Sequence, residues 1–336
     1  MTSRLTLYLK ILFLTRYVFC NITTMKRIIT PIIVSILILL TVSCNREKEV
    51  LQVFHAGSLS VPLKQMVSEF ETMYPHVKVQ LEGAGSLTCI RKITELNKPC
   101  DVLAVADYSL IDELMIPDYA DHNVMFAGNE LAIGFLKDSH WKDDLTAENW
   151  QEIIMQDDVH YGRSDPDHDP SGYRTVITVN LQERISGSKG LTEQFLKKDQ
   201  KFVRPKGTEL LPLLEVGAID LVFHYRSVLV QHNLGFLSLS DSLNLSNPNL
   251  DDWYSGSCME IEGKDKANRI TKCGEAMVYG ICKPNTSQSK YADEFLQFIT
   301  TRGREILEEN GQPAKQPILT TKSISKPHWF TSINKN

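Results

Sequence analysis

Apolar and polar positions follow two different periods in the residues after about position 50. Short apolar runs at 50–54, 77–81 and 101–105 have the length of strands. Between them, apolar residues recur every three or four positions, which is the period of an amphipathic helix. This β-α-β-α-β order predicts a parallel sheet covered by helices. The first helix is expected from Val61 to Tyr74, with an apolar stripe of Leu63, Met66, Val67, Phe70 and Met73.

Two further apolar runs indicate that the chain leaves this sheet and returns to it. The run 130–135 is expected as a strand that crosses into a second lobe, and 276–281 as the strand that returns. The expected fold is α/β with two lobes, the second inserted into the first. In such sheets, ligands bind outside the carboxyl ends of the strands. The expected bounds are 44–131 plus 279–336 for lobe one and 132–278 for lobe two. The other expected elements are helices at 149–155, 173–185, 210–216, 291–300 and from about 303, and a strand at 219–223.

The first 43 residues have the pattern of a targeting segment. A basic start at Met25, which we expect to be the true first residue, is followed by an apolar run at 28–42. This run indicates a secretory signal peptide and is short for a transmembrane helix. Cys44 follows it directly after a small residue, as in a bacterial lipobox, although Thr41 stands where Leu is commonest. We expect a lipid anchor on Cys44 that holds the protein at the membrane, outside the cytoplasm. A membrane-spanning anchor, or plain secretion with an incidental cysteine, is the alternative.

The charge of the chain limits its partners. The 336 residues carry a net charge of -5, and the pI is about 6.0. A nucleic-acid partner would require a basic face, so we expect none. A small anionic ligand stays possible, because backbone N–H groups do not enter a charge count.

The cysteines beyond Cys44 are Cys89, Cys100, Cys258, Cys273 and Cys282. Their spacing is not that of a zinc site. Cys258 and Cys273 flank a polar, turn-rich stretch and could pair across a hairpin in an oxidising compartment. Buried free thiols are an equal alternative.

Small hydrogen-bonding residues precede the helical runs at four places, namely 54–58, 83–86, 169–172 and 206–208. A helix N-terminus exposes unpaired N–H groups and the positive end of the helix dipole. Several such ends that converge would form an anion site without Lys or Arg. Ser58 and Ser86 each lie between a strand and a helix and offer hydroxyls to such a ligand; the alternative is that they are simple N-caps. Tyr225 follows a buried strand and can point its hydroxyl into the cleft, or into water.

The most polar segment of the chain is 165–174. Its alternating aspartates are similar to a calcium loop, but Pro170 stands where that loop needs Gly and Val176 where it needs Glu. His168 has no second histidine at a zinc-ligand spacing. A solvated acidic turn is the alternative. Because nucleophile-elbow, P-loop and dinucleotide fingerprints are absent from the sequence, we expect no enzymatic activity and no cofactor.

Several segments together resemble the tungstate/molybdate-binding proteins of ABC importers, in particular their archaeal-type tungstate-binding branch. The resemblance covers about residues 50 to 320. It implies a type II periplasmic-binding-protein fold, in which two α/β lobes close by a hinge motion on a tetrahedral oxyanion. The segments that carry it are 54–60, 84–86, 91–96, 104–108, 169–174, 225–235 and 311–313.

The resemblance also implies a ligand site. Ser58 and Ser86 would donate to oxyanion oxygens from lobe one. The backbone N–H groups of Ser171 and Gly207 and the Tyr225 hydroxyl would donate from lobe two. The further candidates are Gly57, Pro170, Glu209 and His224.

Two carboxylates approach the metal centre in that branch, an Asp and a Glu. Asp169 is the expected Asp, and it would select against sulfate and phosphate by charge repulsion. The Glu is expected at the position of Gly207, and Glu209 lies two residues on. His224 also departs from the usual acidic residue before Tyr225, so tungstate preference and six-coordination of the metal are not predicted.

The function implied is that of a monomeric lipoprotein that captures molybdate or tungstate and delivers it to an ABC transporter permease. One alternative is a binding protein for another tetrahedral oxyanion, such as sulfate or phosphate. A further alternative is a metal-dependent surface hydrolase that uses the carboxylates of 165–169.

Overall fold

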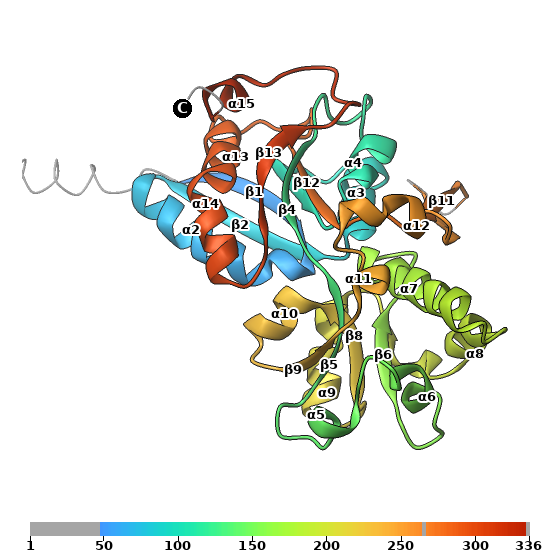
Figure 1. The fold of residues 1–336 in the computed structure, drawn as a ribbon. Coiled ribbons are helices and arrows are strands. Elements are labelled where there is room, and N and C mark those ends of the chain that lie inside the picture. Colours follow the sequence, from blue (N-terminus) through green and yellow to red (C-terminus); the bar gives the residue numbers. More distant parts are fainter. Residues whose placement is uncertain (1–47, 264–266, 334–336) are drawn as a thin grey trace, which may run out of the picture. The chain divides into compact units, whose positions relative to one another are not determined.

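The computed structural model describes residues 48–263 and 267–333 (Figure 1). The expected signal segment, the start at Met25 and the lipid attachment at Cys44 lie outside the described residues. Within these two ranges, no helix is both long and apolar enough to cross a membrane.

The first sheet has six strands in the order β13-β4-β12-β3-β1-β2. β1 pairs in parallel with β2 and β3, which confirms the expected β-α-β-α-β unit. β12 returns to this sheet and pairs antiparallel with β3 and β4. The strands are β1 (Glu49–Ala56), β2 (Val77–Ala84), β3 (Val102–Val105), β4 (Val124–Gly128), β12 (Val278–Cys282) and β13 (Ala314–Leu319). The helices that follow the three parallel strands are α2 (Ser60–Met73), α3 (Ser86–Thr94) and α4 (Ser109–Leu114).

The apolar stripe of α2 packs into the core with one exception. Leu63, Met66 and Phe70 are buried, whereas Met73 is 61% exposed. Tyr74, just after the helix, takes the expected place of Met73, and its ring lies 4.6 Å from that of Phe70. Both residues fall on the same helical face by spacing, so periodicity alone does not distinguish them.

The second sheet has five strands in the order β7-β6-β8-β5-β9. β5 pairs antiparallel with β8 and β9 in this sheet, and Figure 1 shows that β4 leads directly into it. The exact bounds of the two lobes stay a prediction. The strands are β5 (Leu131–Phe135), β6 (Tyr161–Ser164), β7 (Val203–Arg204), β8 (Leu221–Tyr225) and β9 (Gly235–Ser238). The helices between them are α5 (Trp141–Asp144), α6 (Trp150–Ile154), α7 (Pro170–Ser186), α8 (Leu191–Lys197), α9 (Leu211–Glu215) and α10 (Arg226–Gln231).

The helix α7 begins three residues before its expected start. Asp169 is its N-cap and accepts a hydrogen bond from the N–H of Ser171, at 3.0 Å. Pro170 occupies the first helical position, where its fixed φ and missing N–H suit a helix start. The helix ends where Gly187 adopts a left-handed conformation, with φ of 70°. Asp-Pro is therefore a helix-start signal here, and the polar turn ends at Asp169.

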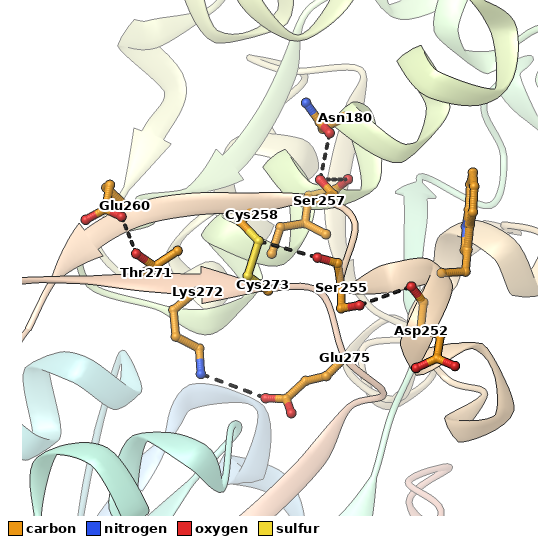
Figure 2. Close-up of a disulfide and its surroundings, with 12 residues drawn as sticks. Asn180, Asp252, Ser255, Ser257, Cys258, Glu260, Thr271, Lys272, Cys273 and Glu275 are labelled. Atoms are coloured by element: carbon orange, nitrogen blue, oxygen red, sulfur yellow. Dashed lines mark hydrogen bonds and ion pairs between the residues drawn. A yellow bond between two sulfur atoms is a disulfide. The ribbon is translucent and has the colours of Figure 1, made fainter.

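A disulfide joins the two strands of a hairpin (Figure 2). Cys258 lies directly opposite Cys273 in the antiparallel pair of β10 (Cys258–Glu262) and β11 (Arg269–Cys273). Of the two alternatives that the sequence left open for these cysteines, the structure shows the disulfide. Cys89, Cys100 and Cys282 are buried free cysteines. The remaining helices are α11 (Asp241–Asn244), α12 (Asp251–Tyr254), α13 (Ala292–Thr300), α14 (Arg302–Glu309) and α15 (His328–Ile333).

Candidate functional site

The loops after β1 and β2 press directly against loops of the second sheet. A Cβ atom at Gly85 would lie 2.2 Å from the carbonyl oxygen of His168 and 2.9 Å from that of Pro205. A Cβ atom at Gly57 would lie 3.2 Å from the side chain of Lys206. Only a residue without a side chain allows the backbones to approach this closely at Gly85. The segments that the sequence singled out therefore meet where the two sheets face each other.

Ser58 is buried, and its hydroxyl lies 2.9 Å from that of Tyr279. The amide oxygen of Asn129 accepts from the N–H of Glu130, which leaves the Asn129 Nδ2 group to donate to the Tyr279 oxygen at 3.0 Å. With Asn129 as its donor, Tyr279 has its own proton available for Ser58 Oγ. When Tyr279 donates in this way, the Ser58 hydroxyl proton is left for a ligand.

The hydroxyl oxygens of Ser86 and Tyr225 each accept a hydrogen bond from the protein. Ser86 Oγ accepts from the N–H of Ala106 at 3.0 Å, and the Tyr225 oxygen accepts from Arg174 Nη1 at 2.9 Å. The Ala106 N–H and the Arg174 guanidinium can only donate. The Ser86 and Tyr225 hydroxyls therefore still have their own protons to donate. Both side chains are buried, and neither proton has an acceptor in the described part of the chain. Ser86 is not an N-cap, because Gly85 holds that position at the start of α3.

Asp169 ties together two backbone segments of the second lobe. Its Oδ1 accepts from the N–H of Ser171 and its Oδ2 from the N–H of Gly207, both at 3.0 Å. Burial raises the pKa of Asp169, and these two hydrogen bonds act in the opposite direction. The two N–H groups expected to donate to a ligand thus donate to Asp169 in this structure. Each carboxylate oxygen still has a free lone pair.

His224 lies beside Gly207 at the end of β8. Its Nδ1 accepts from the N–H of Tyr225 at 2.7 Å, so its ring proton is on Nε2. A Cβ atom at Gly207 would lie 2.9 Å from Nε2 and 3.2 Å from Ser171 Oγ. Burial lowers the pKa of His224 to about 3, so the ring is neutral.

The three remaining candidates from the sequence are Glu209, Pro170 and Gly57. Glu209 is exposed at the end of the short helix η3 (Gly207–Glu209), so it brings no carboxylate to the buried site. Pro170 has no N–H and offers no backbone donor. Gly57 is buried in the turn η1 (Gly57–Leu59), and its carbonyl accepts from the hydroxyl of Ser60.

The carboxylates of 165–169 do not point at a common centre. Asp165 caps its own turn by accepting from the N–H of Asp167, and it lies 3.3 Å from His168. Asp167 pairs with Arg269 at 3.3 Å, while Asp169 turns into the site. Within the described ranges, no cluster of three or more His, Cys, Asp or Glu side chains could hold a metal ion.

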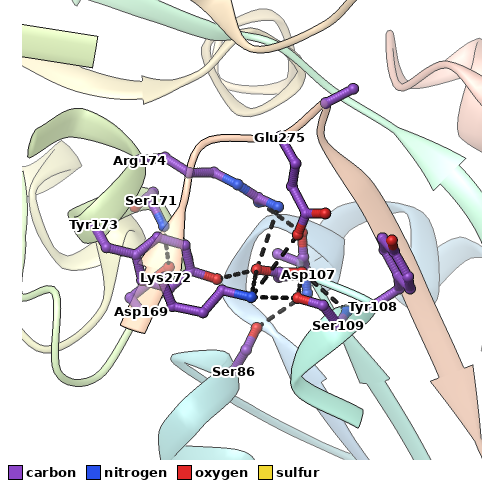
Figure 3. A network of polar contacts seen from close by, with 12 residues as sticks. Ser86, Asp107, Tyr108, Ser109, Asp169, Ser171, Tyr173, Arg174, Lys272 and Glu275 are labelled. Atoms are coloured by element: carbon purple, nitrogen blue, oxygen red, sulfur yellow. Dashed lines mark hydrogen bonds and ion pairs between the residues drawn. The ribbon is translucent and has the colours of Figure 1, made fainter. Parts of the chain in front are cut away.

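A buried charge network adjoins the site (Figure 3). Asp107, just after β3, lies 3.5 Å from Lys272 Nζ and 3.8 Å from Arg174 Nη2, and it accepts a hydrogen bond from Tyr173. Burial alone would raise the pKa of Asp107, but Lys272 and Arg174 hold it well below its usual range. Arg174 also donates to the carbonyl of Ala106 at 2.7 Å. This guanidinium therefore connects the end of β3 with the Tyr225 hydroxyl of the second sheet.

Sequence reasoning assigned no role to several residues that orient these groups. Asp107 and Arg174 lay inside the segments that carried the resemblance. Asn129 and Tyr279 gave a weaker signal, since each is a polar group beside or within an apolar strand, at the two crossings between the sheets. Lys272 is a buried cation in a polar hairpin, and no sequence pattern marks it as buried.

The chain is similar to known solute-binding proteins. The family described as bacterial extracellular solute-binding protein matches residues 51–312. An uncharacterized solute-binding protein of Petrotoga mobilis is 41% identical over 268 residues, covering 79% of this chain and 84% of the relative. The molybdate/tungstate-binding protein WtpA of Pyrococcus abyssi is 36% identical over 294 residues, covering 79% and 84%.

A solved structure shows the same fold. The periplasmic molybdate-binding protein of Azotobacter vinelandii aligns with a TM-score of 0.58 at 15% identity, over 79% of this chain and 100% of that one. The expected two-lobed α/β architecture of periplasmic binding proteins is thereby confirmed.

Proposed function

Because the chain belongs to the bacterial extracellular solute-binding proteins, we propose that it captures molybdate or tungstate and delivers the anion to an ABC transporter permease. The observation that carries this proposal is that the buried hydroxyls of Ser86 and Tyr225 both accept a hydrogen bond from the protein. The protons of Ser86 and Tyr225 are therefore left to donate, and the Ser58 proton joins them when Tyr279 donates to Ser58 Oγ. An oxyanion, whose oxygens only accept, is the complementary ligand.

The donors are neutral and fixed before the ligand arrives. A buried anion is costly unless it is paired and hydrogen-bonded. The Tyr225 and Ser86 hydroxyls, held by Arg174 and by the N–H of Ala106, supply these bonds without reorganisation, and the guanidinium of Arg174 adds a positive charge behind Tyr225. Lobe closure would complete the site, because Ser58 and Ser86 come from the first sheet and Tyr225 from the second.

Asp169 has a separate role in this proposal. Each of its two carboxylate oxygens has a free lone pair, and we assign these lone pairs to the metal centre of the bound oxyanion. Molybdenum or tungsten can accept a further oxygen ligand, whereas the sulfur of sulfate cannot. The relative named molybdate/tungstate-binding protein supports this ligand class.

The cellular context is part of the same proposal. We infer a signal peptide over 1–43 and a lipid anchor on Cys44, which would hold a monomer at the outer side of the membrane beside its permease. The protein would bind and release the anion without a cofactor and without catalysis.

Sulfate is a second candidate ligand, and one contact favours it. Both Asp169 oxygens accept backbone N–H groups at 3.0 Å, which spreads their charge and weakens the repulsion of an anion that offers no metal centre. The nearby hydroxyl donors make no distinction between tetrahedral oxyanions of equal charge.

Calorimetric titration of the signal-less protein with tungstate, molybdate and sulfate in parallel tests the proposal. Tight binding of the first two without sulfate supports it. Binding of sulfate alone would assign the second candidate, and binding of none of the three would refute both.

A further inference from the structure

Among the described residues, His224 is a buried side chain with one ring nitrogen that lacks a well-formed hydrogen bond. It is 2% exposed at the end of β8. Its Nδ1 accepts the N–H of Tyr225, so Nε2 carries the proton. In the described part of the chain, this Nε2–H group makes no hydrogen bond of normal geometry, and the backbone of Gly207 is its nearby polar contact. A buried donor without an acceptor destabilises a fold, and it persists where a ligand supplies the acceptor.

The position of Nε2 is within the candidate site. It lies 2.9 Å from where a Cβ atom at Gly207 would stand, next to Ser171 Oγ at 3.2 Å from the same point. The N–H of Gly207 is held by Asp169, and the residue after His224 is Tyr225. The unpartnered donor is therefore surrounded by residues from every second-lobe segment of the site.

The ring also needs the space that a side chain at 207 would take. A contact of 2.9 Å between Cβ and a ring nitrogen is shorter than real Cβ atoms show. The imidazole is fixed by its bond to the Tyr225 N–H and cannot move aside freely. A side chain at position 207 would therefore displace the His224 ring.

We propose that His224 is a ligand-binding residue that donates its Nε2–H to an oxygen of the bound oxyanion, and that Gly207 is required to leave room for the ring. This inference rests on the proposed function. A donor of this kind binds the oxygens of the anion and not its central atom. Loss of this donor should therefore lower the affinities for molybdate and tungstate to the same extent.

Two substitutions at His224 separate the donor from the ring. His224→Leu removes the donor at similar bulk, whereas His224→Gln keeps an N–H group near the position of Nε2. We expect roughly a tenfold or greater loss of affinity for both anions in the Leu variant, the effect of one hydrogen bond to a charged ligand. The Gln variant should stay within about threefold of the unchanged protein.

His122 offers a matched control. It is 5% exposed, its Nε2 also has no partner, and burial lowers its pKa as well. It lies just before β4, at the opposite end of that strand from Asn129. His122→Leu should leave both affinities unchanged.

A Gly207→Ala variant tests the space argument. It should lower the affinities for both anions when His224 is present. In a His224→Ala background the effect should be smaller, because no ring is then displaced. Equal effects in both backgrounds would overturn the role given to Gly207.

The experiment is calorimetry with sodium molybdate and sodium tungstate on the purified protein and its variants, with ¹⁵N-edited NMR of the histidine rings of the unchanged protein. The Nε2 proton of His224 should shift on addition of molybdate. An unshifted proton, or an unchanged affinity of folded His224→Leu, would overturn the inference. Absence of binding by the unchanged protein would instead refute the proposed function. If the Leu variant fails to fold, the NMR result decides.

Discussion

The Tyr279 hydroxyl gives the sharpest test of how the site orients its donors. Tyr279→Phe deletes one oxygen and keeps the ring, which lies 6.2 Å from that of Tyr225. The Tyr279 oxygen accepts from Asn129, and its own proton is available for Ser58, whose hydroxyl lies 2.9 Å away. Without it, the Ser58 hydroxyl is free to rotate and its proton is no longer directed at a ligand.

The expected magnitude follows from the bonds that are lost. Asn129 Nδ2 keeps a second acceptor, Ser227 Oγ, at 2.7 Å, so the deletion does not leave this amide without a partner. The free energy of unfolding should fall by about 1 kcal/mol, the net worth of one buried hydrogen bond. The free energy of anion binding should weaken by about 0.5–1.5 kcal/mol, which is roughly a twofold to tenfold higher Kd.

Tyr161→Phe is the matched control for this variant. Tyr161 is also a fully buried tyrosine, and its hydroxyl donates to the carbonyl of Phe195 within the second lobe. Both variants should unfold at similarly lower urea concentrations, but only Tyr279→Phe should raise the Kd for molybdate by calorimetry. If Tyr279→Phe loses stability and keeps its affinity, Ser58 is not a ligand donor and the reasoning is wrong.

Three further predictions concern the charge network and the hairpin. Asp107→Asn removes the anion shared by two buried cations, and urea unfolding should show a loss of about 3 kcal/mol or more, as for broken buried ion pairs. Burial, followed by the charge of Asp107, raises the pKa of Glu275 to about 7, above its unfolded value of 4.5. Its protonated form is therefore favoured by folding, and stability relative to Glu275→Gln should fall as the pH rises from about 4.5 to 7 in urea titrations. Reduction of Cys258–Cys273, which are 15 residues apart, should lower the unfolding free energy by about 3 kcal/mol when urea curves with and without a reductant are compared.

The sequence predicted the first parallel unit well, because its strands and helices have clear periods and short connections. β3 is buried along its whole length, as a continuous apolar run in a parallel sheet should be. β4 was missed, since Val124–Gly128 is a short run that directly precedes the apolar run at 130–135. The short strands β6, β7 and β9 were missed as well, and they are ordered by pairing with neighbours far along the chain. Such pairing leaves no local pattern.

The hydroxyls of the candidate site could be located from sequence, but not their polarity. Each hydroxyl lies at the end of a strand, and a strand end is a local feature that the apolar pattern marks. The direction of its proton depends on a group from elsewhere in the chain: Arg174 is 51 residues from Tyr225, and Asn129 is 150 residues from Tyr279. Only the fold brings these donors to the hydroxyl oxygens. A substitution at a supporting donor should therefore change ligand affinity without touching a residue that contacts the ligand, and a sequence comparison restricted to the contacting hydroxyls would not anticipate that effect.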